Sequence, residues 1–171
     1  MLSVAGELCQ GVLLHSFNTP KYTSEIVLPS LAEGAARAGR SLENIDVNAG
    51  GFIVTGANEE EIETERQATK ARISFYASTR SYSPVFEIHG WTDTAQKLYR
   101  MSIEGRWNEM ASEITDDMLD AFAVVGDYDH IVDRIKERYG PYATSVGFSI
   151  TTRTDGDRER LRHLVRQLQE L

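Results

Sequence analysis

Short apolar runs alternate along this chain with longer stretches in which apolar residues recur at helical spacing. Residues 11–17 (GVLLHSF) are almost continuously apolar, which is typical of a strand covered on both faces, as in parallel sheets. Residues 47–55 and 145–151 form two further strand-like runs. The paired glycines Gly50 and Gly51 in the second run predict a bulge, or a close approach by another backbone or a ligand.

Cap residues and prolines divide the first intervening stretch. Thr19 followed by Pro20 predicts the start of a helix, and Gly39 is a natural residue for its end. Pro29 lies inside this span, so we expect a kink or break near residues 25–28.

The rest of the chain predicts a series of helices. Asn58 and Glu61 form a loose capping box for a helix that ends near residues 76–78. Residues 79–91 are the least regular and predict an ordered loop excursion. The remaining elements are short helices at residues 93–103 and 107–114, a turn at 116–122, a helix from Asp127 to Gly140, and a last helix from about residue 157 with a leucine stripe.

Strands that alternate with helices indicate parallel βαβ units, so the predicted fold class is α/β in one structural unit, residues 1–171. A closed (β/α)8 barrel needs eight strands and about 250 residues, and an open sheet of few strands leaves apolar edges. Either more chain or another subunit is expected to cover these edges. Residues 2–8 are spaced like the end of a helix already under way, which favours truncation.

Composition narrows the function classes. The formal net charge is −8, with 26 acidic and 18 dispersed basic residues, which argues against nucleic-acid binding. No apolar run approaches the ~20 residues that span a bilayer, and the first residues lack the pattern of a secretory signal. Cys9, the only cysteine, is expected to be a small buried thiol. These features predict a cytoplasmic protein without membrane partners.

Five stretches carry a family resemblance through their order and spacing: AGELCQGVLLHSFNTPKY (5–22), VLPSLAEGAARAGR (27–40), GGFIVTG (50–56), FYASTRSYSPVFEIHGW (75–91) and DDMLDAFAVVGDYDHIVDRIKERYG (116–140). Together they resemble the luciferase-like monooxygenase superfamily, in its coenzyme F420-dependent oxidoreductase branch. Gln10 departs from the pattern, because such sequences often have Asp before the strand glycine.

The resemblance implies a partial TIM-like (β/α) barrel, usually a homodimer or higher homo-oligomer, that binds F420 or alternatively FMN. The implied reaction is hydride transfer between the deazaflavin or flavin and a small organic substrate. In such enzymes the acid/base residues come largely from the N-terminal half of the barrel. This chain would begin just before the sixth strand, so it is expected to be incomplete as a catalyst, and no catalytic residue is assigned.

Two candidate cofactor-binding residues follow the first strand. His15 lies at the end that forms the active-site mouth in barrels. It could hydrogen-bond a flavin-like ring or a substrate carbonyl, or shuttle a proton; the alternative is a hydrogen bond to the next loop. Asn18 is either an amide ligand or a turn residue.

Three further candidates lie later in the chain. Tyr82 and His89 belong to an aromatic segment, residues 75–91. This segment either covers a planar cofactor or packs on the barrel or on a partner subunit. Arg153 could bind a phosphate near the last strand, although most such arginines are solvated. His15 and His89 have no complementary ligand spacing, so no metal site is expected.

Two other functions compete with the oxidoreductase hypothesis. One is a non-catalytic structural or assembly protein, a partial barrel that self-associates to cover its strand edges. The other is a small-molecule binding module that uses the aromatic segment without redox chemistry.

Overall fold

The computed structural model describes residues 1–152 and 154–169. The helices are α1 (Leu2–Leu8), α2 (Pro20–Tyr22), α3 (Leu28–Arg37), α4 (Glu59–Ala77), α5 (Ser83–Glu87), α6 (Thr92–Ile103), α7 (Asp116–Phe122), α8 (Ile131–Tyr139) and α9 (Asp155–Gln169). The strands are β1 (Gly11–Leu13), β2 (Asp46–Ala49), β3 (Phe52–Val54), β4 (Ala123–Val125) and β5 (Ser145–Val146).

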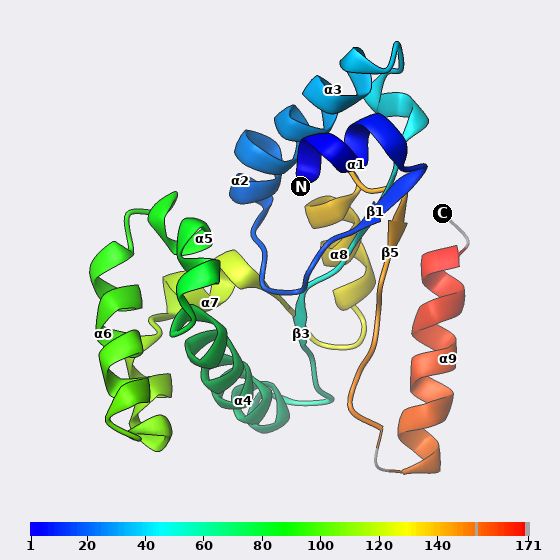
Figure 1. The fold of residues 1–171 in the computed structure, drawn as a ribbon. Helices are drawn as coiled ribbons and strands as arrows, with labels where there is room; N and C mark the ends of the chain where they lie inside the picture. The colour runs from blue at the N-terminus through cyan, green and yellow to red at the C-terminus, as the bar shows by residue number, and fades with distance from the viewer. Residues whose placement is uncertain (153, 170–171) are drawn as a thin grey trace.

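All strand pairs among the described residues are parallel. Strands β1, β2 and β5 form one sheet in that order, and β3 pairs with β4 in a second one. In the register Val12 lies opposite Val47, and Asn48 lies opposite Ser145. The predicted α/β fold with parallel strands and covering helices is therefore confirmed (Figure 1).

The glycine pair divides the second predicted strand into β2 and β3. A Cβ on Gly51 would lie 2.5 Å from the Tyr139 hydroxyl, and one on Gly50 would lie 3.1 Å from the carbonyl oxygen of Gly147. The close approach that the glycines predict is thus observed, and its partners are α8 and the chain that follows β5. A side chain at either position would push these segments apart, so the close packing at the break between β2 and β3 depends on glycine.

Helices cover one face of the first sheet. Val27 and Leu31 pack on Val47 of β2, and α8 and α9 bury Ile135 and Leu164 in a second cluster. Leu13 of β1 points away from this layer and is 81% exposed. The prediction that this strand is covered on both faces is therefore wrong, because no described element packs on the side that carries Leu13.

A separate helical layer, α4 to α7, stands beside the strands (Figure 1). It buries a cluster that includes Phe86, Leu98 and Leu119. The predicted loop at residues 79–91 is instead mostly helical, with a 3-10 turn at Arg80–Tyr82 followed by α5. Pro84 occupies the first turn of α5, where its missing N–H costs no hydrogen bond, so proline there is compatible with a helix.

The helix from Thr19 follows the predicted plan. The Thr19 side chain accepts a hydrogen bond from the Tyr22 N–H, and Gly39 has a φ of 69° just beyond α3. A π-helical turn at Thr23–Val27 marks the expected break. The Asn58 cap of α4 is likewise observed, with its side chain accepting from the Glu61 N–H.

Three expectations need correction. Cys9 is exposed, because it follows the last residue of α1 with extended backbone instead of lying on the buried face of that helix. Strand pairing of the third predicted strand extends only over Ser145–Val146. Helix α7 occupies the residues where a turn was expected, and strand β4, directly after it, was missed. No helix among the described residues is long and apolar enough to cross a membrane.

Candidate functional site

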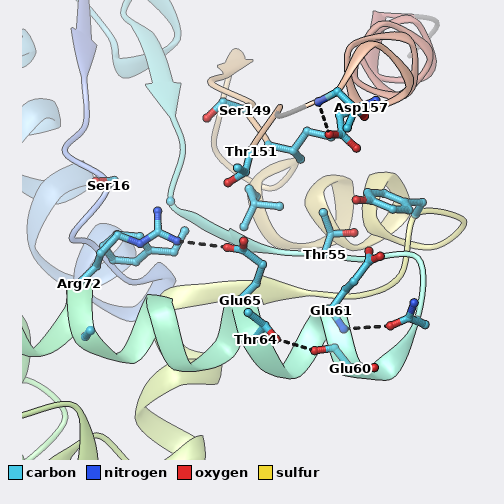
Figure 2. Close-up of a pocket in the computed structure, with 18 of the residues that line it drawn as sticks. Ser16, Thr55, Glu60, Glu61, Thr64, Glu65, Arg72, Ser149, Thr151 and Asp157 are labelled. Atoms are coloured by element: carbon cyan, nitrogen blue, oxygen red, sulfur yellow. Dashed lines mark hydrogen bonds and ion pairs between the residues drawn. The ribbon is translucent and has the colours of Figure 1, made fainter.

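A large cavity opens at the carboxyl ends of the strands, which is the end where α/β folds bind ligands. Its volume is about 1120 Å³. Ser16 follows β1, Thr55 follows β3 and Thr151 lies beyond β5, so three separate βα connections contribute to its wall (Figure 2). The opposite wall is the face of α4, from Glu60 to Tyr76. A cavity of this size accommodates a ligand as large as a dinucleotide or a flavin.

Aromatic side chains line one end of this cavity. Phe52 of β3 and the neighbouring Phe75 and Tyr76 of α4 belong to its wall. The guanidinium carbon of Arg72 lies 5.5 Å from the centre of the Phe52 ring, and an Arg72 nitrogen lies 3.9 Å from Glu65. This end therefore offers flat apolar surface beside a positive charge that Glu65 only partly offsets.

The other end of the cavity is acidic. Glu60 and Glu61 stand at the start of α4, and Asp157 stands in the first turn of α9 (Figure 2). The Glu61 carboxylate accepts a hydrogen bond from the Ala57 N–H at 2.8 Å, and Asp157 accepts from the Thr154 N–H at 2.8 Å. Both carboxylates thus stabilise helix starts. An anionic group of a ligand is disfavoured there and is expected at the Arg72 end.

His15 and Tyr82, far apart in sequence, are brought together beside the aromatic end. The Nδ1 atom of His15 accepts a hydrogen bond from the Phe17 N–H at 2.9 Å, so a neutral ring carries its proton on Nε2. That atom lies 3.4 Å from the Tyr82 hydroxyl, and the His15 ring meets Tyr76 edge-on at 5.0 Å. If Nε2 donates to the Tyr82 oxygen, the Tyr82 hydroxyl proton remains free for a ligand.

Asn18 lies just before α2, and His89 lies between α5 and α6 and contacts the N-cap residue of α2; the cavity wall described above includes neither. The Asn18 side chain donates to the Thr23 hydroxyl at 2.8 Å and accepts from the Thr19 N–H at 2.9 Å, as a turn residue does. The His89 ring stacks on the Trp91 ring with their centres 4.4 Å apart, and Nε2 of His89 lies 2.9 Å from the Thr19 hydroxyl. Burial, and secondarily the charge of Lys21, lower the pKa of His89 below its ordinary value.

The aromatic segment itself is anchored. Phe86 is fully buried, and Tyr82 packs against the same cluster as Phe17. This geometry matches packing on the barrel, the second of the two roles considered for the segment.

Arg153 lies outside the described residues, although Thr151 and Thr154 on either side of it line the cavity. Within residues 1–152 and 154–169 no group of three or more His, Cys, Asp or Glu side chains could hold a metal ion. Sequence reasoning missed Arg72 as a wall residue, and it considered Phe75 and Tyr76 only as part of the aromatic segment, not as a helix face with Arg72. Their spacing of three and four positions places them on one face of a helix, and that face could have been examined for chemistry as well as for packing.

Parallel strands, helices on their outer face and a ligand-sized cavity at the carboxyl ends define a portion of an α/β barrel protein. The chain belongs to the luciferase-like monooxygenase family, whose model matches residues 1–145.

Similar full-length proteins support this membership. An uncharacterized protein of Mycobacterium tuberculosis is 38% identical over 138 residues, which is 81% of this chain and 41% of that protein. The 5,10-methylenetetrahydromethanopterin reductase of Methanopyrus kandleri is 33% identical over 147 residues, 85% of this chain and 40% of the reductase.

A solved structure gives the same placement. The coenzyme F420-dependent tetrahydromethanopterin reductase from Methanopyrus kandleri superposes with a TM-score of 0.70 at 32% identity, covering 98% of this chain and 46% of that one. The chain therefore spans less than half the length of the proteins it matches.

Proposed function

We propose that this chain is the C-terminal part of an F420-dependent oxidoreductase, with FMN as the alternative cofactor, and that it is incomplete as a catalyst by itself. The observation that carries the proposal is the aromatic end of the cavity, which stands at the carboxyl ends of parallel strands in a chain related to an F420-dependent reductase. As a single structural unit, residues 1–171, the chain would supply one wall of the cofactor site.

The residues present fit a flavin-like ring. Phe52, Phe75 and Tyr76 offer flat apolar surface, which excludes water and packs on planar aromatic systems. Ser16 in the cavity wall and Tyr82 beside its aromatic end carry hydroxyl groups that can hydrogen-bond polar ring atoms. When bound, a deazaflavin supplies the hydride acceptor or donor for a small organic substrate.

His15 would act through Tyr82. With its proton on Nε2, the imidazole orients the Tyr82 hydroxyl so that this group donates toward a ligand. Arg72 would attract an anionic group of the cofactor or the substrate. Among the five residues first singled out from the sequence, Asn18 and His89 would support the site by holding the start of α2, and Arg153 remains a proposed phosphate contact.

Titration of F420 and of FMN into the chain, followed by ligand fluorescence, tests this function. We expect saturable binding of a deazaflavin and little turnover, because the family resemblance places the acid/base residues in the other part of the barrel. Phe75→Leu removes an aromatic face of the cavity and is expected to raise the Kd by about threefold to tenfold.

Trp107→Leu is the matched control for this titration. Phe75 and Trp107 are 54% and 50% exposed, and the centres of their rings are 6.0 Å apart, but only Phe75 lines the cavity. The control should bind as the unmodified chain does. Absence of saturable binding of either ligand at about 1 mM, or equal effects of both substitutions, would refute the proposed site.

A second candidate function is non-catalytic assembly, in which copies of the chain cover one another's strand edges. The exposed Val4, Leu8 and Leu13 of the α1–β1 region favour it. It predicts a discrete homo-oligomer that melts cooperatively and binds neither F420 nor FMN. A folded monomer in light scattering would eliminate it.

A further inference from the structure

A second, smaller cavity lies in the helical layer, away from the strand ends. Its volume is about 420 Å³, within the range of small-ligand sites. It is open to solvent on one side and is bordered by the end of α4, the 3-10 turn after it, α5 and α6, the elements drawn in green in Figure 1. It shares no lining residue with the large cavity.

Two arginines without acidic partners converge on this cavity. Arg80 and Arg100 both line it, and among the described residues neither guanidinium makes a hydrogen bond or an ion pair. Most other cations of this acidic chain are engaged; Arg66, Lys97 and Arg106, for example, each pair with a carboxylate. Both side chains are exposed, and Glu87 is the one carboxylate in the described lining. Two positive charges against one negative charge suit an anionic ligand, although the protein as a whole has a net charge of −8.

The geometry of Arg80 suits an oxyanion. Its guanidinium carbon lies 4.3 Å from the centre of the Tyr99 ring, a cation–π contact that restrains the group. Stacking uses the face of a guanidinium and leaves its N–H edge free, and that edge matches the oxygens of a carboxylate or a phosphate.

The remaining polar groups of the cavity favour the same ligand. Thr92 and Gln96 line it from the first turns of α6, a helix whose N-terminus has no side-chain cap, so its N–H groups add positive potential. Glu87 accepts a hydrogen bond from the Ser83 hydroxyl at 2.8 Å, and its negative charge is outnumbered by the two guanidinium groups. Buried Ala77 and Ala95 provide a small apolar floor.

We propose that the cavity bounded by Arg80, Tyr99 and Arg100 binds a small oxyanion, a phosphate or carboxylate group, at a site separate from the cofactor wall. This inference does not depend on the proposed oxidoreductase function. The two guanidinium groups bind the anion, Tyr99 holds Arg80 in position, and Gln96 and Thr92 complete the hydrogen bonding.

Anion titrations followed by nuclear magnetic resonance test this site on the intact chain. Inorganic phosphate and succinate are added separately at constant ionic strength, and the arginine Nε–Hε signals are recorded. We expect saturable shifts of the Arg80 and Arg100 signals with at least one anion. A response to phosphate alone identifies a phosphate ligand, and a response to succinate alone identifies a carboxylate ligand.

The double variant Arg80→Gln, Arg100→Gln should weaken binding, followed through backbone signals of α6, by at least about tenfold. The control Arg162→Gln, Arg166→Gln makes the same change of net charge on exposed positions of α9 and should bind as the unmodified chain does. Shifts that do not saturate with either anion, or equal weakening in both variants, would overturn the proposal. Circular dichroism of each variant confirms that it is folded before it is titrated.

Discussion

The Thr19 hydroxyl lies 2.9 Å from Nε2 of His89 and joins the N-cap of α2 to the turn that precedes α6. The same hydroxyl accepts a hydrogen bond from the Tyr22 N–H at 3.1 Å. One side chain therefore links the strand-bearing part of the chain to the helical layer. Lys21 strengthens this link, since its ammonium donates to the Ile88 carbonyl oxygen at 2.8 Å.

This link makes stability depend on pH. Burial, followed by the charge of Lys21, lowers the pKa of His89 from 6.5, so the folded state favours the neutral ring. The stability that a neutral His89 contributes is present above pH 6.5 and is lost as the pH falls through the lowered pKa.

We therefore expect the melting temperature of the unmodified chain to fall more steeply below pH 6.5 than that of His89→Gln, which does not titrate. His163→Gln, on an exposed position of α9, is the control and should follow the unmodified chain. The expectation fails if the difference between the chain and His89→Gln is the same at every pH.

The sequence predicted the elements whose signals are local. Thr19 and Asn58 cap helices through their own side chains, and the Gly50–Gly51 pair breaks a strand because other backbone comes close. Strand β4 escaped prediction because its three residues continue directly from α7, and pairing with β3 makes them a strand. Such a pairing is a tertiary effect that no local pattern of apolar residues reveals.

The candidate site was only partly predictable for a similar reason. The sequence singled out His15 because it lies at the end of a predicted strand, but its contact with Tyr82 depends on how the helical layer folds back. The acidic end formed by Glu60, Glu61 and Asp157 joins two helix starts from distant parts of the chain. In the sequence, each of these acidic groups looks like ordinary helix capping. Only the fold brings the two helix starts to one cavity.

Close packing of α1 on α3 gives a prediction for Gly34. A Cβ there would lie 1.8 Å from the carbonyl oxygen of Ser3, which is backbone and cannot move alone. Gly34→Ala should therefore separate the two helices at a cost of about 1–3 kcal/mol, against at most about 1 kcal/mol gained in helix propensity. Urea denaturation measures the resulting loss in the free energy of unfolding.

Gly147→Ala is the control for this substitution, because its Cβ would meet nothing closer than 3.8 Å. It should change the free energy of unfolding by less than about 0.5 kcal/mol. A Gly34→Ala variant as stable as Gly147→Ala would show that α1 does not pack against α3 in solution.

Arg138 of α8 caps the end of α7. Its guanidinium donates to the carbonyl oxygens of Asp120 and Ala121. These oxygens lie in the last turn of the helix, where a carbonyl group has no backbone N–H partner within the helix. Lysine offers one nitrogen in place of the two that Arg138 uses, so it does not reproduce both bonds with the same geometry. Arg138→Lys should therefore cost about 1–2 kcal/mol in chemical denaturation and speed amide exchange in β4, the strand that follows.

Arg134→Lys provides the comparison for Arg138. Arg134 donates to one carbonyl oxygen, that of Val125, and a lysine can keep a single bond. We expect a smaller loss of stability than for Arg138→Lys. Equal losses would mean that the charge near α7 matters and the bridging of two carbonyl groups does not.

Leu13 provides a prediction about association. It is 81% exposed on β1, a strand whose described pairing is with β2 alone. Burying one leucine contributes about 1.5–3 kcal/mol, and a symmetric dimer would bury it twice. Leu13→Ser should then weaken self-association by roughly a hundredfold or more in sedimentation equilibrium, without lowering the melting temperature of the monomer.

Ile103→Ser, at a 68% exposed position of the helical layer, should leave association unchanged. If the unmodified chain is monomeric, or if both substitutions act alike, the face that carries Leu13 does not form the contact between copies, and the assembly function loses its structural basis.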